Sequence, residues 1–151
     1  MYRTVDEFTH FNFKDAEIFE IRREKGHLVW ELGYVTILGD NSCNRDIRDM
    51  GTHALTLLLH TASDIVVIKE GYKVYDADGN LKETFEDEVI AEADYETAFA
   101  ELEHSHIYSF EKRESEYICS IDTEENTYEI RCKAKSDVAE WERFANKDSA
   151  Y

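Results

Sequence analysis

Alternation of hydrophobic and polar residues recurs along most of the chain and predicts a domain built mainly of β-strands. Clusters of Gly, Asn, Asp and Ser separate the alternating segments, as expected for turns. Lys25-Gly26 and the run from Asp76 to Asn80 are the clearest of these turns. We expect seven or eight antiparallel strands, within residues 15–24, 27–38, 53–61, 64–76, 81–90, 107–113, 116–122 and 127–134.

Two segments have the spacing of short helices instead. Near residues 94–102, Asp94 stands where an N-cap residue is expected, and an apolar face follows at i, i+3, i+4 and i+7 in Tyr95, Ala98, Phe99 and Leu102. Near residues 137–146, a helix opened by Ser136 or Asp137 would carry an apolar stripe of Val138, Trp141, Phe144 and Ala145. The second segment predicts a C-terminal helix.

The chain has no proline, no Gly/Ser-rich linker and no internal repeat, so residues 1–151 are expected to form a single β-rich domain. The fold class is therefore α+β and mainly antiparallel β. We expect a sandwich or a partly closed barrel, capped by the C-terminal helix. The longest irregular segment, residues 39–52, is rich in Asp, Asn and Gly and is predicted to be a loop that could carry function.

A large negative charge limits the partners that the chain can bind. The net charge is −17, from 34 acidic and 17 basic residues, which opposes binding to nucleic acid and to anionic lipid. The N-terminal segment lacks the pattern of a signal peptide, and no apolar run is long enough for a membrane span. We therefore expect a cytoplasmic protein, a monomer or a homodimer, whose charge suits a basic protein partner.

More than half of that net charge lies in one segment, residues 83–103, which holds nine carboxylates and neither Lys nor Arg. Glu101 and Glu103 fall at the negative end of the predicted helix, where the helix dipole disfavours acids. A docking face for a basic partner would explain them, and a solvated face that maintains solubility is the alternative. The residues predicted to bind the partner are Glu83, Glu86, Asp87, Glu88, Glu92, Glu96, Glu101 and Glu103.

A second hypothesis assigns a metal or a small ligand to His104 and His106, with Glu111 as a third metal ligand. Two His at i and i+2 on a strand share one face. The segment resembles the first half of the cupin metal motif, although the flanking glycines and the second half of that motif are absent. Glu111 would face away from both His in an unbroken strand. Polar surface histidines are the alternative, and no cofactor is expected.

Thiol chemistry has little support in the sequence. Cys43, Cys119 and Cys132 are an odd number of cysteines and are expected to be free in a reducing compartment. A disulfide between Cys119 and Cys132 would require the two-residue turn Glu125-Asn126, and a three-residue loop is equally compatible with the sequence. Cys43 has no flanking signature of a nucleophile. Together these residues favour a non-enzymatic protein, without excluding an enzyme.

Residues Phe11 to Leu38, with the motif Phe13-Lys14-Asp15-Ala16, resemble the opening of several small bacterial β-rich families. Some members of these families are thought to be immunity proteins of toxin systems. Lys14 stands where those families would have His, so no role of that His is carried over. The resemblance implies an immunity-like or regulatory module, which agrees with an acidic face that binds a basic protein.

Overall fold

The computed structural model describes residues 1–146 and consists mainly of antiparallel β-structure, as the sequence predicts. The helical elements are η1 (Phe8–His10), η2 (Glu92–Asp94) and the α-helix α1 (Tyr95–Glu101). The strands are β1 (Tyr2–Val5), β2 (Phe11–Asn12), β3 (Glu17–Glu24), β4 (His27–Gly33), β5 (Val35–Ile37), β6 (Met50–Thr52), β7 (Leu55–His60), β8 (Ser63–Lys69), β9 (Tyr72–Tyr75), β10 (Leu81–Phe85), β11 (Glu88–Val89), β12 (His106–Arg113), β13 (Glu116–Asp122), β14 (Thr127–Lys133) and β15 (Ser136–Trp141).

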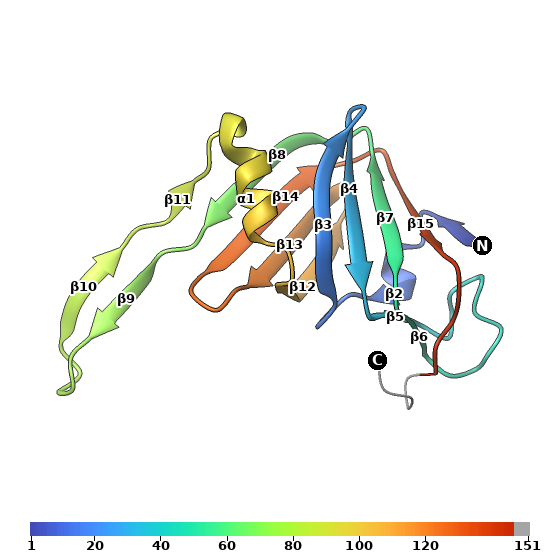
Figure 1. Cartoon of the computed structure of the whole chain (residues 1–151), viewed down its shortest axis with the longest axis horizontal. Coiled ribbons are helices and arrows are strands. Elements are labelled where there is room, and N and C mark those ends of the chain that lie inside the picture. Colours follow the sequence, from blue (N-terminus) through green and yellow to red (C-terminus); the bar gives the residue numbers. More distant parts are fainter. Residues whose placement is uncertain (147–151) are drawn as a thin grey trace.

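Ten of these strands form one sheet, in the order β1-β15-β7-β4-β3-β12-β13-β14-β8-β11. Its two halves meet at β3 and β12, where Glu17 pairs with His106. In Figure 1 the half with β3, β4 and β7 lies in front of the half with β12, β13 and β14. Side chains from both halves fill the core, because the Trp30 ring of β4 lies 4.8 Å from the Phe110 ring of β12. The sheet is not a closed barrel, since β1 and β11 remain its edges.

The strand count was predicted too low for two reasons: β1, β2, β6 and β15 lie outside the predicted strands, and several predicted strands are divided. Tyr34 takes a left-handed conformation (φ 62°) that divides the predicted strand 27–38 into β4 and β5. β5 thereby leaves the large sheet and joins the three-stranded sheet β2-β5-β6. A second break at Glu70-Gly71 divides the predicted strand 64–76 into β8 and β9.

The predicted C-terminal helix at residues 137–146 is wrong, because this segment begins with strand β15. β15 lies between β1 and β7 in the large sheet. It pairs with β7 over residues 136–141 and with β1 over residues 138–141. Val138 and Trp141, three residues apart, point to opposite faces of the strand and are both buried, so β15 is covered on both faces. Asp137 caps no helix: its carboxylate is buried and accepts a 2.6 Å hydrogen bond from the Tyr117 hydroxyl.

The short helix near residues 94–102 is confirmed as α1, and its apolar face packs into the core through Tyr95, Ala98, Phe99 and Leu102. Asp94 occupies the N-cap position, but its side chain makes no capping hydrogen bond. Two contacts place the helix between the sheet halves. The Tyr95 hydroxyl donates to the carbonyl of Ile65 on β8, and Glu96 binds Arg23 on β3.

β9 and β10 form a two-stranded hairpin, residues 72–85, that extends away from the rest of the molecule (Figure 1). We call this hairpin the arm. Its turn is the predicted one, because the Asp76 carboxylate accepts hydrogen bonds from the backbone N–H groups of Asp78 and Asn80. Gly79 supplies the positive φ of 82° that the turn requires. The predicted turn at Lys25-Gly26 is also present, between β3 and β4.

All three cysteines are free, as expected. The β13–β14 hairpin closes at the pair Asp122 and Thr127, so its loop has four residues, Thr123 to Asn126. This register places Cys119 opposite Ile130 and Cys132 opposite Tyr117. The alternative disulfide between Cys119 and Cys132 is therefore not formed.

Candidate functional site

A hollow lies on the surface where the end of α1, the β13–β14 loop and the end of β8 meet. We call it the main hollow; its volume is about 560 Å³. Four carboxylates line it. Among residues 1–146, one lysine and one histidine also line it. The lining residues are Lys69, Glu101, Glu103, His104, Ser105, Thr123, Glu124, Glu125, Asn126 and Tyr128.

A second hollow of about 270 Å³ lies at the base of the arm, and we call it the root hollow. Lys69 and Asn126 line both hollows, which are therefore adjacent. The root hollow combines carboxylates with two aromatic rings. Its lining residues are Lys69, Glu70, Gly71, Tyr72, Phe85, Glu86, Glu88 and Asn126.

The β13–β14 loop stands beside both hollows and holds its shape through one threonine. The Thr123 hydroxyl accepts a 2.9 Å hydrogen bond from the Asn126 backbone N–H and lies 2.7 Å from the Asn126 carbonyl oxygen. The Thr123 N–H also donates to that carbonyl. These contacts tie the two ends of the loop together, and Glu124 and Glu125 are exposed at the hollow.

Glu70, which lines the root hollow, is partly buried and lies near other carboxylates. The pKa of Glu70 is raised, chiefly by partial burial and then by the negative charges of Glu129, Asp87 and Asp122. The pKa of the Tyr128 hydroxyl in the main hollow is also raised, mainly by burial. A cation placed at Glu70 would relieve both the burial cost and the repulsion of its charge.

The structure divides the eight predicted partner-binding residues into three groups. Glu86, Glu88, Glu101 and Glu103 line the two hollows and are brought together. Glu83 lies on the arm opposite Val74. The others make contacts within the protein: Glu92 and Glu96 form ion pairs with Arg23 at 3.0 and 2.8 Å, and Asp87 accepts a 2.7 Å hydrogen bond from the Gly71 N–H.

The sequence did not predict a partner-binding role for three carboxylates that line the two hollows, namely Glu70, Glu124 and Glu125. Glu124 and Glu125 follow a predicted strand in a turn, and their adjacency to each other was the only available signal. Nothing in the sequence indicated that this turn would lie next to the end of α1.

The three proposed metal ligands do not converge. His104 precedes β12 in a left-handed conformation (φ 69°), and its Nδ1 lies 3.1 Å from a carboxylate oxygen of Glu17. A bulge between Ile107 and Ser109 places His106 and Glu111 on the same face, contrary to the expectation for an unbroken strand. Their β13 partners, Asp122 and Ile118, are nevertheless four residues apart, or about 13 Å. Within residues 1–146, no group of three His, Cys, Asp or Glu side chains is arranged to hold a metal ion.

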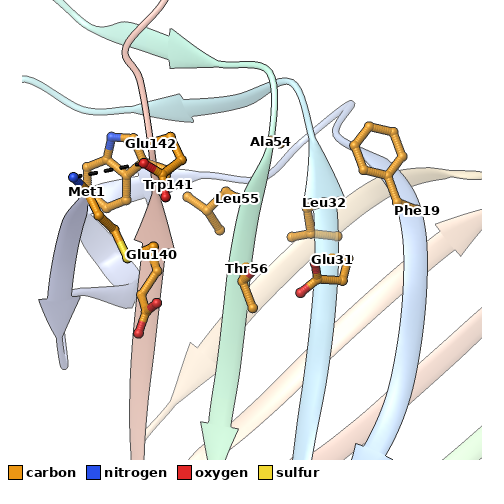
Figure 2. A pocket seen from close by; sticks show the side chains of 10 residues that line it. All are labelled: Met1, Phe19, Glu31, Leu32, Ala54, Leu55, Thr56, Glu140, Trp141 and Glu142. Carbon is orange, nitrogen blue, oxygen red and sulfur yellow. Dashed lines mark ion pairs between the residues drawn. The ribbon is translucent and has the colours of Figure 1, made fainter.

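A third hollow, of about 160 Å³, lies at one end of β4, β7 and β15 and is shown in Figure 2. Its lining mixes apolar side chains such as Phe19 and Leu32 with Glu31, Glu140 and Glu142. Glu142 forms an ion pair of 3.9 Å with the N-terminal amine of Met1. Thr56 on β7 pairs with Glu31 on β4 in this lining, and we assign the hollow no reaction.

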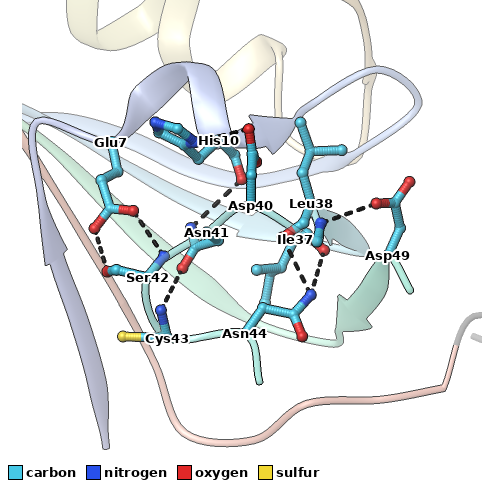
Figure 3. A network of polar contacts seen from close by, with 11 residues as sticks. Glu7, His10, Ile37, Leu38, Asp40, Asn41, Ser42, Cys43, Asn44 and Asp49 are labelled. Carbon is cyan, nitrogen blue, oxygen red and sulfur yellow. Dashed lines mark hydrogen bonds and ion pairs between the residues drawn. The ribbon is translucent and has the colours of Figure 1, made fainter. Parts of the chain in front are cut away.

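The side chains of its asparagines hold the long loop after β5 in place (Figure 3). The buried side-chain amide of Asn44 lies 3.1 to 3.2 Å from the carbonyl oxygens of Ile37, Leu38 and Arg48. The Glu7 carboxylate accepts hydrogen bonds from the backbone N–H and the hydroxyl of Ser42. These contacts account for the polar composition that had suggested a functional loop.

No protein-family model, curated protein or solved structure shows significant similarity to this chain. None of the helices within residues 1–146 has the length and apolar character that a membrane span requires.

Proposed function

We propose that the protein is a non-enzymatic interaction module, immunity-like or regulatory, that binds a basic protein partner through the main hollow. One observation carries this proposal. Glu101 and Glu103 from the end of α1 and Glu124 and Glu125 from the β13–β14 loop line a single open hollow, although about twenty residues separate the two pairs. Four carboxylates at one hollow produce a concentrated negative potential, which attracts a cationic surface.

Solubility alone does not explain this arrangement. A solvated acidic face needs only dispersed charge, and gathering like charges around a concave surface raises their mutual repulsion. In the adjacent root hollow the pKa of Glu70 is raised chiefly by burial, and neighbouring negative charges raise it further. A partner that brings Lys or Arg side chains into the hollows would neutralise the repulsion, and electrostatic steering would accelerate its association.

The test compares two variants that each remove four negative charges. The hollow variant carries Glu101→Gln, Glu103→Gln, Glu124→Gln and Glu125→Gln. The control variant carries Asp64→Asn, Glu111→Gln, Glu114→Gln and Glu142→Gln, all at exposed positions outside both hollows. A basic protein captured from the native lysate at low salt is purified and titrated against both variants and the wild-type protein.

We expect the hollow variant to lose at least about ten-fold in affinity and to show a weaker dependence on salt, because it lacks the charges that face the partner. The control variant should stay close to wild type. An equal loss in both variants would mean that only net charge matters, and it would contradict a specific site in the main hollow.

A further inference from the structure

The arm carries several aromatic side chains that are about half exposed to solvent. Tyr72 is 50% exposed and Phe85 is 40% exposed, although their rings stack with centroids 4.5 Å apart. Tyr75 and Leu81, which pair on the other face of the arm, are each 57% exposed. A two-stranded hairpin without a core is only marginally stable in water, so exposed rings on it indicate a surface that a partner covers.

The stacked rings of Tyr72 and Phe85 line the root hollow together with carboxylates. Glu70, Glu86 and Glu88 line the same hollow, and Lys69 is its one basic side chain among residues 1–146. An aromatic face beside carboxylates is the environment that suits a guanidinium group, which is planar, stacks on rings and pairs with carboxylates through parallel hydrogen bonds. An ammonium group would gain the charge attraction but not the stacking.

We propose that the root hollow binds an arginine side chain of the basic partner, with the guanidinium against the Tyr72–Phe85 ring pair and paired to a carboxylate of the hollow. This inference rests on the proposed function, and it names the side chain that the arm recognises. The raised pKa of Glu70 supports it, since a cation would relieve the burial and repulsion that raise this value.

Charge complementarity selects this occupant over a second copy of the chain. Two molecules with a net charge of −17 would bring like charges together at the arm, where Glu83, Glu86 and Glu88 are exposed. Nucleic acid and anionic lipid are disfavoured for the same reason. A basic protein can meet both the rings and the carboxylates.

The base of the arm is held in place before any partner binds. A Cβ atom added at Gly71 would lie 2.6 Å from the carbonyl carbon of Glu86 and 2.8 Å from the nitrogen of Asp87, so only glycine permits this close approach. The Gly71 N–H also donates to the Asp87 carboxylate. A fixed base keeps the ring pair beside the carboxylates, which lowers the entropic cost of binding.

The experiment measures binding of two peptides with equal charge, hexa-arginine and hexa-lysine, by calorimetry and amide chemical shifts at low salt. We expect the wild-type protein to bind hexa-arginine about two- to five-fold more tightly, as one cation–π contact at an exposed site would give. Phe85→Leu should abolish this preference while hexa-lysine binding stays unchanged. Tyr75→Leu is the matched control, because Tyr75 is an exposed ring of the arm that does not line the root hollow.

Equal affinity of the wild-type protein for both peptides, or a preference that survives Phe85→Leu, would overturn the arginine site. Neither result would affect the proposed function, which the capture experiment with the hollow variant decides separately. Sedimentation of the same variants provides another check. A concentration-dependent mass that Phe85→Leu abolishes would assign the arm to a second copy of the chain and would also overturn the inference.

Discussion

Single residues decide what each carboxylate of the acidic segment contributes. Arg23 on β3 holds Glu96 through two hydrogen bonds of 2.8 and 2.9 Å, and it holds Glu92 through a third at 3.0 Å. These two acids therefore attach α1 to the sheet instead of facing a partner. Glu101 and Glu103, at the other end of the helix, line the main hollow, and the Glu101 carboxylate also interacts with the Tyr128 hydroxyl of β14.

The thiols differ in reactivity because their burial differs. Burial raises the pKa of Cys132 to about 12 and raises the pKa of Cys119 well above its usual range, so neither forms the reactive thiolate at neutral pH. Cys43 is partly exposed in the loop after β5. We expect a colorimetric thiol reagent to modify one cysteine in the native protein and three after denaturation. Rapid modification of all three in native buffer would contradict this burial.

Glu70→Gln is expected to stabilise the protein at neutral pH. The pKa of Glu70 is higher in the folded protein than in the unfolded chain, so its protonated carboxyl group favours folding at a pH below the pKa of the unfolded state. This contribution is lost as the pH rises through the pKa of the folded state. Urea denaturation at pH 7 should show a higher midpoint for Glu70→Gln, and the difference should vanish below about pH 4. Glu124→Gln, which removes one exposed charge, is the control and should have a smaller effect. A lower midpoint for Glu70→Gln at pH 7 would refute this prediction.

At the scale of elements, α1 and the arm differ in how they are stabilised. α1 buries one whole face in the core, so packing defines its position. The arm buries little, and its position depends on the backbone contact at its base. The arm is therefore the element most sensitive to changes at Gly71 and Asp87.

Gly71→Ala should loosen the arm without unfolding the rest of the protein. The new Cβ would displace the backbone of residues 85–87, so we expect faster amide hydrogen exchange in β9 and β10 and unchanged protection in β4 and β13. Asp87→Ala should act in the same direction because it removes the acceptor for the Gly71 N–H. Asp87→Asn keeps an acceptor oxygen and is the control. Unchanged exchange in the arm of Gly71→Ala would mean that this contact does not hold it.

At the scale of the whole molecule, net charge opposes folding. A charge of −17 on 151 residues makes the compact state repel itself, and salt screens this repulsion. We expect Tm to rise by about 2–4 °C between low salt and about 0.3 M NaCl, which is the range that 1 kcal/mol produces in a domain of this length. The rise should be smaller in the hollow variant. A Tm that falls as salt is added would indicate that attractive ion pairs dominate instead.

Local pattern in the sequence was enough to predict several features. The mainly antiparallel class, the buried face of α1 and the turn at Lys25-Gly26 all follow from residues a few positions apart, which interact within one element. The concentration of acids in residues 83–103 was likewise visible in the sequence. Such features depend on neighbours along the chain, so the tertiary structure did not change them.

Other features depended on partners far away in the chain. Residues Ser136–Trp141 became a strand rather than a helix because β1 and β7 offered unpaired edges. The break at Gly71 depends on the close approach of the backbone of residues 85–87. The main hollow exists only because the fold places Glu124 and Glu125 near Glu101. Sequence thus determined the kinds of elements and the sign of the charge, whereas long-range pairing decided where the charges meet.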